Sequence, residues 1–243
     1  MDGEFKSDRL PFRHVPTGYD AVIGLGAACQ VAEQCRRHLG AAPGVPFDWI
    51  ITPFDAIGKV LADKGAGLGQ RFVSIRGGTS TQCVNYGVLY EHEFPRDPDR
   101  QVIFDAETIA DCRSRMAYKM QKLIKILGSH KKILFIRAYA STGLPGDRFN
   151  DEPLTSADLN HLAALIEGWA RGFTFDLLFV HSPDRTGEKV DLSGPLSSRV
   201  QVREMPHPPG TEWWGIDEHW IALFDEFGLL KPKLSVQAGR PSL

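Results

Sequence analysis

The chain has 243 residues, of which 42% are hydrophobic, enough to bury one large core with a small appendage. Its 28 Lys and Arg residues balance 30 Asp and Glu residues without a dense basic run, which argues against binding nucleic acid through its phosphates. Residues 1–18 are polar and lack the apolar segment of a secretory signal, and no apolar stretch approaches the roughly 18 residues that span a bilayer. We therefore expect a cytoplasmic protein that has no membrane or nucleic-acid partner and acts on a small molecule or a peptide.

In the first half of the chain, the sequence predicts a strand followed by three helices, with a β-rich segment between the second and third helices. YDAVIGLG (19–26) predicts a short buried strand, and residues 27–40 predict a helix that ends at Gly40. A second helix is expected over 53–65. Residues 67–94 are rich in Gly, Thr, Val and Tyr, which is typical of short strands or a hairpin. The longest helical pattern covers 105–130, with apolar residues on one face and basic residues on the other.

The second half alternates strands with helices. KKILFIRAY (131–139) and FDLLFVHSPD (175–184) predict buried strands, separated by a helix over 155–172 that is capped by Thr155 or Ser156. Residues 199–206 alternate as an edge strand does, and 217–229 predict the last helix. This alternation predicts one α/β domain over 19–230, with a mostly parallel sheet of four to six strands, flanking helices and a small β-rich insertion. Residues 1–18 are a polar extension and 231–243 a frayed tail.

A parallel sheet brings the carboxyl ends of its strands to one edge, where binding sites gather. Here the strand ends would bring together residues 26–29, Arg137 and His181. A guanidinium cannot lose its charge, so Arg137 must reach solvent, a buried acid or an anionic ligand. His181 either faces a site or stabilises the turn that follows it. One hypothesis is therefore a non-catalytic binding module, whose strand-end pocket holds an anionic sugar or nucleotide.

Of the four cysteines, Cys29 has a distinctive setting. The chain has no C-x-x-C pair and no zinc signature, so we expect neither disulfides nor a bound metal, and no motif demands another cofactor. Residues 24–29 read G-x-G-x-x-C, close to a dinucleotide loop, but two prolines obstruct the second strand that such a loop requires. At a helix start, the macrodipole favours the reactive thiolate of Cys29. Core packing is the remaining alternative for this cysteine.

Four sequence segments carry a resemblance to a known family. They are GLGAACQVAEQCRRHL (24–39), PFDWIITP (46–53), YGVLYEHEF (86–94) and KKILFIR (131–137). Their order resembles the signature of a bacterial family described as papain-like cysteine peptidases, with Ala27 standing where that family commonly has serine.

The resemblance implies that Cys29 is a nucleophile and that His92 is its base, with Asp48 as the carboxylate that orients the imidazole. Gly26, Arg137 and His181 are the candidate substrate-binding residues. Papain itself carries its cysteine on a long helix against an antiparallel sheet, whereas this chain predicts alternating α/β structure. We therefore expect the family's site on a different fold.

The segment WWGIDEHW (213–220) offers another arrangement. Its Asp217 and His219 resemble the late acid–histidine pair of lipase-like esterases of the Gly-Asp-Ser type, although those have D-x-x-H spacing and a serine nucleophile. Among the candidate bases for Cys29 we rank His92 first, then His181, then His219. The leading hypothesis is a cysteine-dependent hydrolase, peptidase-like or acyl-transferring.

Overall fold

The computed structural model describes residues 18–40, 44–138, 153–186 and 189–230. The expected polar extension, apart from Gly18, and the expected tail over 231–243 lie outside the described residues. The elements in chain order are β1 (Ala21–Gly24), α1 (Gln30–Gln34), the π-helical turn η1 (Cys35–Leu39), α2 (Phe54–Ala62), β2 (Phe72–Ile75), the 3₁₀ turn η2 (Arg76–Gly78), β3 (Ser80–Cys83), β4 (Leu89–Tyr90), α3 (Ala106–Ser129), β5 (Lys132–Ala138), β6 (Leu154–Thr155), α4 (Ser156–Trp169), β7 (Thr174–His181), α5 (Pro183–Thr186), β8 (Val190–Asp191), β9 (Val200–Glu204) and α6 (Asp217–Glu226).

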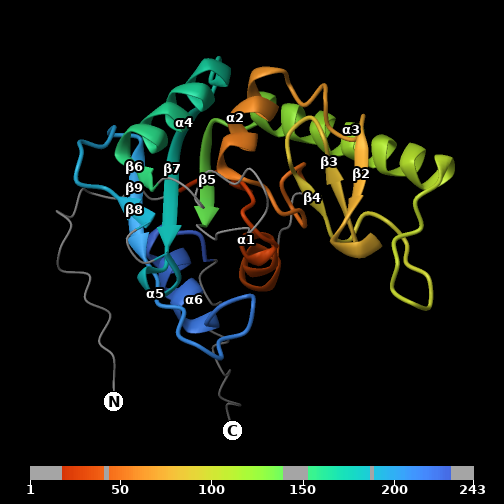
Figure 1. Ribbon diagram of the computed structural model, residues 1–243. Coiled ribbons are helices and arrows are strands. Elements are labelled where there is room, and N and C mark those ends of the chain that lie inside the picture. The colour runs from red at the N-terminus through yellow and green to blue at the C-terminus, as the bar shows by residue number, and fades with distance from the viewer. Residues whose placement is uncertain (1–17, 41–43, 139–152, 187–188, 231–243) are drawn as a thin grey trace, which may run out of the picture.

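Within the described residues, the main sheet has four parallel strands in the order β1-β5-β7-β9 (Figure 1). Gly24 lies opposite Ile136, and Arg137 lies opposite Phe179. The prediction of an α/β fold with a mostly parallel sheet is confirmed, and β9 lies at the edge as its alternating pattern predicted. All four strands therefore deliver their carboxyl ends to the same edge of the sheet.

Helices cover both faces of this sheet. Along β5, Ile133 and Phe135 join the core formed with α2, α3 and α4, whereas Leu134 and Ile136 pack with α1, η1 and α6 on the other face. This division follows from the strand geometry, because successive side chains point to opposite faces. A strand buried on both faces is typically an unbroken apolar run, as ILFI (133–136) is within β5.

The β-rich insertion forms a separate antiparallel sheet in the order β2-β3-β4, between α2 and α3 in the chain. Aromatic rings fill it, with Phe72 in edge contact with Tyr90, Phe94 and Phe104. A second small pair, β6 with β8, was not predicted from the sequence. An isolated antiparallel bridge joins Leu89 of β4 to Ile51, in the segment that precedes α2.

The helix after β1 differs most from expectation. It begins at Gln30 instead of residue 27, because Gly26 and Ala27 adopt left-handed φ angles of 73° and 85° that a right-handed helix excludes. By contrast, α3 begins at Ala106, close to the start of the pattern predicted over 105–130, and the side chain of Asp105 caps it by accepting a hydrogen bond from the Thr108 N–H at 2.9 Å. Within the described ranges, no helix is both long and apolar enough to pass through a bilayer.

Two neighbouring residues on α3 test the packing of this helix. Leu123 is buried in the core, whereas the side chain of Ile124 is exposed to solvent. We expect Leu123→Ala to lower the free energy of unfolding by about 2–5 kcal/mol, because it leaves a cavity in the core. Ile124→Ala should change it by less than about 1 kcal/mol. Urea denaturation of the two variants measures the difference, and equal losses would contradict the assigned face of α3.

Candidate active site

The turn that leaves β1 is held in an unusual conformation. The Leu25 N–H continues the parallel ladder by donating to the Ile136 carbonyl at 2.8 Å, and the chain then bends through left-handed Gly26 and Ala27. Gly26 is required for a second reason, since a Cβ at this position would lie 2.7 Å from Thr52 Oγ1. Cys29 follows two residues after this bend, as the residue that precedes α1.

Main-chain hydrogen bonds bring three of the four family-like segments together. The Thr52 N–H donates to the Ala27 carbonyl at 3.4 Å. Its neighbour Ile51 exchanges hydrogen bonds with Leu89, at 3.0 and 2.9 Å. The turn before Cys29, the segment PFDWIITP and the segment YGVLYEHEF therefore lie side by side. The fourth segment, β5, pairs directly with β1.

The thiol of Cys29 is the most exposed of the four cysteines, with 9% of the residue's surface accessible. Burial, and after it the negative charge of Glu91, raises the pKa of Cys29 to about 11. Asp48 adds a smaller effect in the same direction. The thiol is therefore protonated at neutral pH, and the expected effect of the helix start does not dominate here. Any attack by this sulfur requires a base.

Asp48 is a buried carboxylate beneath the same turn. Its Oδ2 accepts a hydrogen bond from the Val45 N–H at 3.0 Å, and its Oδ1 lies 3.4 Å from the position that a Cβ on Gly24 would take. Burial raises the pKa of Asp48 to about 6, despite the Val45 hydrogen bond and the charge of Lys119. A carboxyl group that titrates so close to neutral pH is suited to proton transfer.

His92 follows β4 in an exposed turn, next to Glu91. Glu91 accepts hydrogen bonds from Arg76 at 3.0 Å and Ser80 at 3.2 Å. In the described parts of the chain, no hydrogen bond joins Cys29 to a histidine, so the assignment of His92 as the base stays a prediction. The negative charge of Glu91, the residue next to His92, acts on Cys29 by raising its pKa.

Arg137 is completely buried. Its Nη1 donates to the Leu25 carbonyl and its Nη2 to the Thr52 carbonyl, both at 2.9 Å. The guanidinium also lies 5.8 Å from the centre of the Phe54 ring. These two hydrogen-bond acceptors are main-chain carbonyls, one in the turn before Cys29 and one in the segment before α2. The sequence alone did not predict them.

His181 lies apart from Cys29, because β5 separates β7 from β1. Two strand spacings correspond to about 10 Å. His181 stacks on Phe179 and lies 3.7 Å from a Glu204 carboxylate oxygen, and burial lowers its pKa. A pocket of about 320 Å³ lies at the amino end of β1, away from the carboxyl ends of the strands, and is lined by residues that include Tyr19, Leu39 and Leu229.

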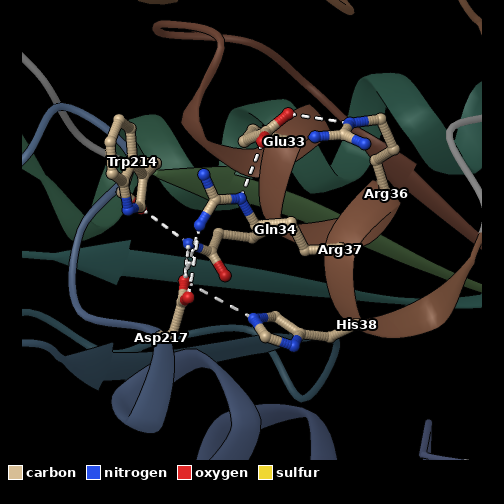
Figure 2. A network of polar contacts seen from close by, with 7 residues as sticks. All are labelled: Glu33, Gln34, Arg36, Arg37, His38, Trp214 and Asp217. Atoms are coloured by element: carbon tan, nitrogen blue, oxygen red, sulfur yellow. Dashed lines mark hydrogen bonds and ion pairs between the residues drawn. The ribbon is translucent and has the colours of Figure 1, made fainter.

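Asp217 connects α6 to the helix that follows Cys29 (Figure 2). Figure 2 shows its carboxylate facing Gln34, which donates at 2.9 Å, and Arg37, which lies 3.2 Å away. His38 approaches the same carboxylate at 3.6 Å, and the Arg37 guanidinium lies 4.6 Å from the centre of the Trp214 ring. These contacts give Asp217 an anchoring role between α6 and η1.

Sequence reasoning missed two residues of this site, Thr52 and Glu91. Thr52 contacts the turn through its main chain, and its buried Oγ1 has no hydrogen-bond partner within the described residues. Both residues were within segments already singled out, next to Pro53 and His92 respectively. No three His, Cys, Asp or Glu side chains of the described ranges gather as a metal ion would require.

Gly26 offers a direct test of the close approach to Thr52. Gly40 has a similar left-handed φ of 64°, but no atom of the described residues lies within 4 Å of a Cβ built on it. We expect Gly40→Ala to lower the free energy of unfolding by about 1–2 kcal/mol through backbone strain alone. Gly26→Ala should cost roughly 1–3 kcal/mol more, because its methyl group overlaps Thr52. Equal losses in urea denaturation would contradict the close approach.

The carboxyl group of Asp48 predicts a specific pH dependence. Its pKa is raised from 3.8 to about 6, so ionisation destabilises the folded state as the pH rises through this range. Asp48→Asn cannot ionise, and its free energy of unfolding relative to the natural protein should therefore increase between pH 4 and pH 7. The expected increase is roughly 2–3 kcal/mol.

Thermal unfolding across this pH range measures the effect, with Asp20→Asn as the control. Backbone N–H groups of Lys132 and Lys131 lower the pKa of Asp20 from its ordinary value of 3.8, so its stabilising effect is fully present above about pH 5. The control should therefore differ from the natural protein by a constant amount between about pH 5 and pH 8. A difference for Asp48→Asn that does not change with pH would be inconsistent with a strained carboxylate.

The chain was compared with protein-family models, with curated proteins and with solved structures, and none of them matches it. The case for this site therefore rests on the residues themselves. The features that single it out are the bend before Cys29, the buried Asp48 and the contacts that join segments far apart in sequence.

Proposed function

We propose that this chain is a thiol-dependent hydrolase or acyltransferase in which Cys29 is the nucleophile. The observation that carries the proposal is the position of Cys29, after a left-handed bend at the carboxyl end of β1. A sharp strand–turn–helix connection presents a nucleophile above the edge of a sheet in enzymes of other folds. A non-glycine residue held at positive φ, as Ala27 is, occurs preferentially at functional sites.

The chemistry requires that a base take the proton of the Cys29 thiol. In the proposed mechanism, His92 accepts this proton while the sulfur attacks the carbonyl carbon of an acyl substrate and forms a C–S bond. The imidazolium then gives the proton to the departing alcohol, amine or thiol. Water, or another acceptor, releases the acyl group from the thioester with His92 again as the base. Asp48 is the carboxylate that favours the imidazolium.

The raised pKa of Cys29 supports a mechanism in which a base removes the thiol proton at the moment of attack. With a pKa of about 11, only about one thiol in ten thousand is ionised at pH 7. A protonated resting thiol resists oxidation and alkylation and becomes nucleophilic only when a bound substrate aligns the base. This differs from proteases that hold a permanent thiolate–imidazolium pair.

Acylation of Cys29 tests the proposal. The protein is mixed with p-nitrophenyl acetate and p-nitrophenyl butyrate, and the covalent adduct is located by intact mass and peptide mapping. We expect one acyl group on Cys29, formed in a burst and then released. Cys29→Ala should abolish both the burst and the turnover. Cys35→Ala removes a buried thiol from the same helical segment and should retain both.

Further variants assign the base. His92→Gln should lower the acylation rate at least tenfold, a loss of about 1.4 kcal/mol of transition-state stabilisation. His181→Gln should leave the rate within about twofold of the natural protein, since its strand lies two positions from β1. Turnover that survives Cys29→Ala would overturn the proposal, and so would a folded protein that acquires no acyl group. If His181→Gln lowered the acylation rate at least tenfold and His92→Gln did not, His181 and not His92 would be the base.

A further inference from the structure

We propose that Arg137 is a positioning residue, which holds the turn before Cys29 in the conformation that presents the thiol. This inference rests on the proposed function of Cys29. It gives Arg137 a role through the main chain of the turn instead of a contact with substrate. Complete burial supports this role, because the guanidinium has no surface on which a substrate could bind.

The hydrogen bonds of this region form a closed circuit. Leu25 is held at both ends, since its N–H donates to the Ile136 carbonyl at 2.8 Å and its carbonyl accepts from Arg137 Nη1 at 2.9 Å. Arg137 Nη2 donates to the Thr52 carbonyl at 2.9 Å. The Thr52 N–H returns to the turn by donating to the Ala27 carbonyl at 3.4 Å. The circuit therefore encloses the two left-handed residues, Gly26 and Ala27.

The circuit explains how Ala27 keeps a φ of 85°. A Cβ disfavours this conformation, so the residue persists there only where its surroundings fix the chain on both sides. Leu25 is fixed before Ala27, and the contact with Thr52 fixes Ala27 itself. Release of either fixed point lets the turn relax and moves Cys29 with it.

The two acceptors require a guanidinium. Leu25 and Thr52 belong to different segments, and the planar fork of arginine presents its donors to both carbonyls in a fixed geometry. A lysine ammonium keeps the charge but presents it at a single nitrogen on a flexible stem. Arg137→Lys is therefore expected to retain the buried charge and lose the circuit.

The rate at which iodoacetamide alkylates each cysteine, followed by peptide mass spectrometry from pH 7 to pH 11, tests the inference. In Arg137→Lys, we expect Cys29 to react at least tenfold faster at pH 8, because the relaxed turn exposes the thiol. The midpoint of its pH–rate profile should fall from about 11 toward its ordinary value. Acyl transfer should fall at least tenfold, the opposite direction.

The other cysteines and one matched arginine serve as controls. Cys35, Cys83 and Cys112 should remain slow in Arg137→Lys, since general unfolding would expose all four thiols. Arg199 also donates to a carbonyl and lies over a phenyl ring, both of Phe175, at a distance from the turn. Arg199→Lys should therefore leave the Cys29 profile unchanged.

A second substitution at the turn separates positioning from a purely structural role. Glycine adopts positive φ without strain, so Ala27→Gly combined with Arg137→Lys should restore at least half of the lost acyl transfer and return the Cys29 profile toward that of the natural protein. Arg137→Gln, which removes the buried charge, provides the same test if the lysine variant does not fold.

An unchanged Cys29 profile in both Arg137 variants would overturn the inference, as would failure of Ala27→Gly to restore it. Because alkylation does not depend on acyl transfer, these outcomes are independent of the proposed function. If Cys29→Ala retained turnover, the proposed function would fail while the alkylation profiles still decided the role of Arg137.

Discussion

The parallel pairing of β1 with β5 is the constraint on which the candidate site depends. β1 has only four residues and lies at the edge of the sheet, so among the described strands it pairs with β5 alone. The pairing extends one residue past β1, because the Leu25 N–H still donates to the Ile136 carbonyl. The Leu25 carbonyl then accepts its hydrogen bond from the guanidinium of Arg137. Two adjacent residues of β5 therefore have different roles. Ile136 makes the last main-chain hydrogen bond to the β1 segment, and Arg137 holds the turn before Cys29 through its side chain.

The fold followed from the sequence where apolar periodicity and caps agree. ILFI (133–136) and LLFV (177–180) are apolar at every position because both faces of β5 and β7 are covered, and the apolar periodicity over 105–130 predicts α3. The helix after β1 could not be placed from the same signals. Ala27 has a high helix propensity, and only its contact with Thr52, 25 positions later, reveals that it is left-handed.

The site could be predicted in part for a related physical reason. Sequence patterns located the segments that meet there, because each contains residue types that are unusual for its position. They did not reveal which atoms of those residues make the contacts. Arg137 was identified as a charge that needs a partner, but its described partners are main-chain carbonyls, which every residue possesses. The pKa of Cys29 was misjudged because the helix start was visible in the sequence, whereas burial and the nearby Glu91 were not.

Departures from ordinary backbone and charge preferences gather at this site. Five non-glycine residues of the described chain have positive φ, and three of them, Lys64, Arg76 and Arg100, lie in exposed connections between consecutive strands or α-helices. The other two are Ala27, which is buried before Cys29, and Trp49, which follows the buried carboxylate of Asp48. A strained residue costs roughly 1–3 kcal/mol, and so does a carboxylate whose pKa is raised by burial. A fold with this much apolar core can tolerate such costs, but packing does not explain why they coincide within two short loops. The function proposed for Cys29 accounts for the coincidence, because a presented thiol and a carboxyl group that titrates near neutral pH each require a conformation or charge that folding alone disfavours.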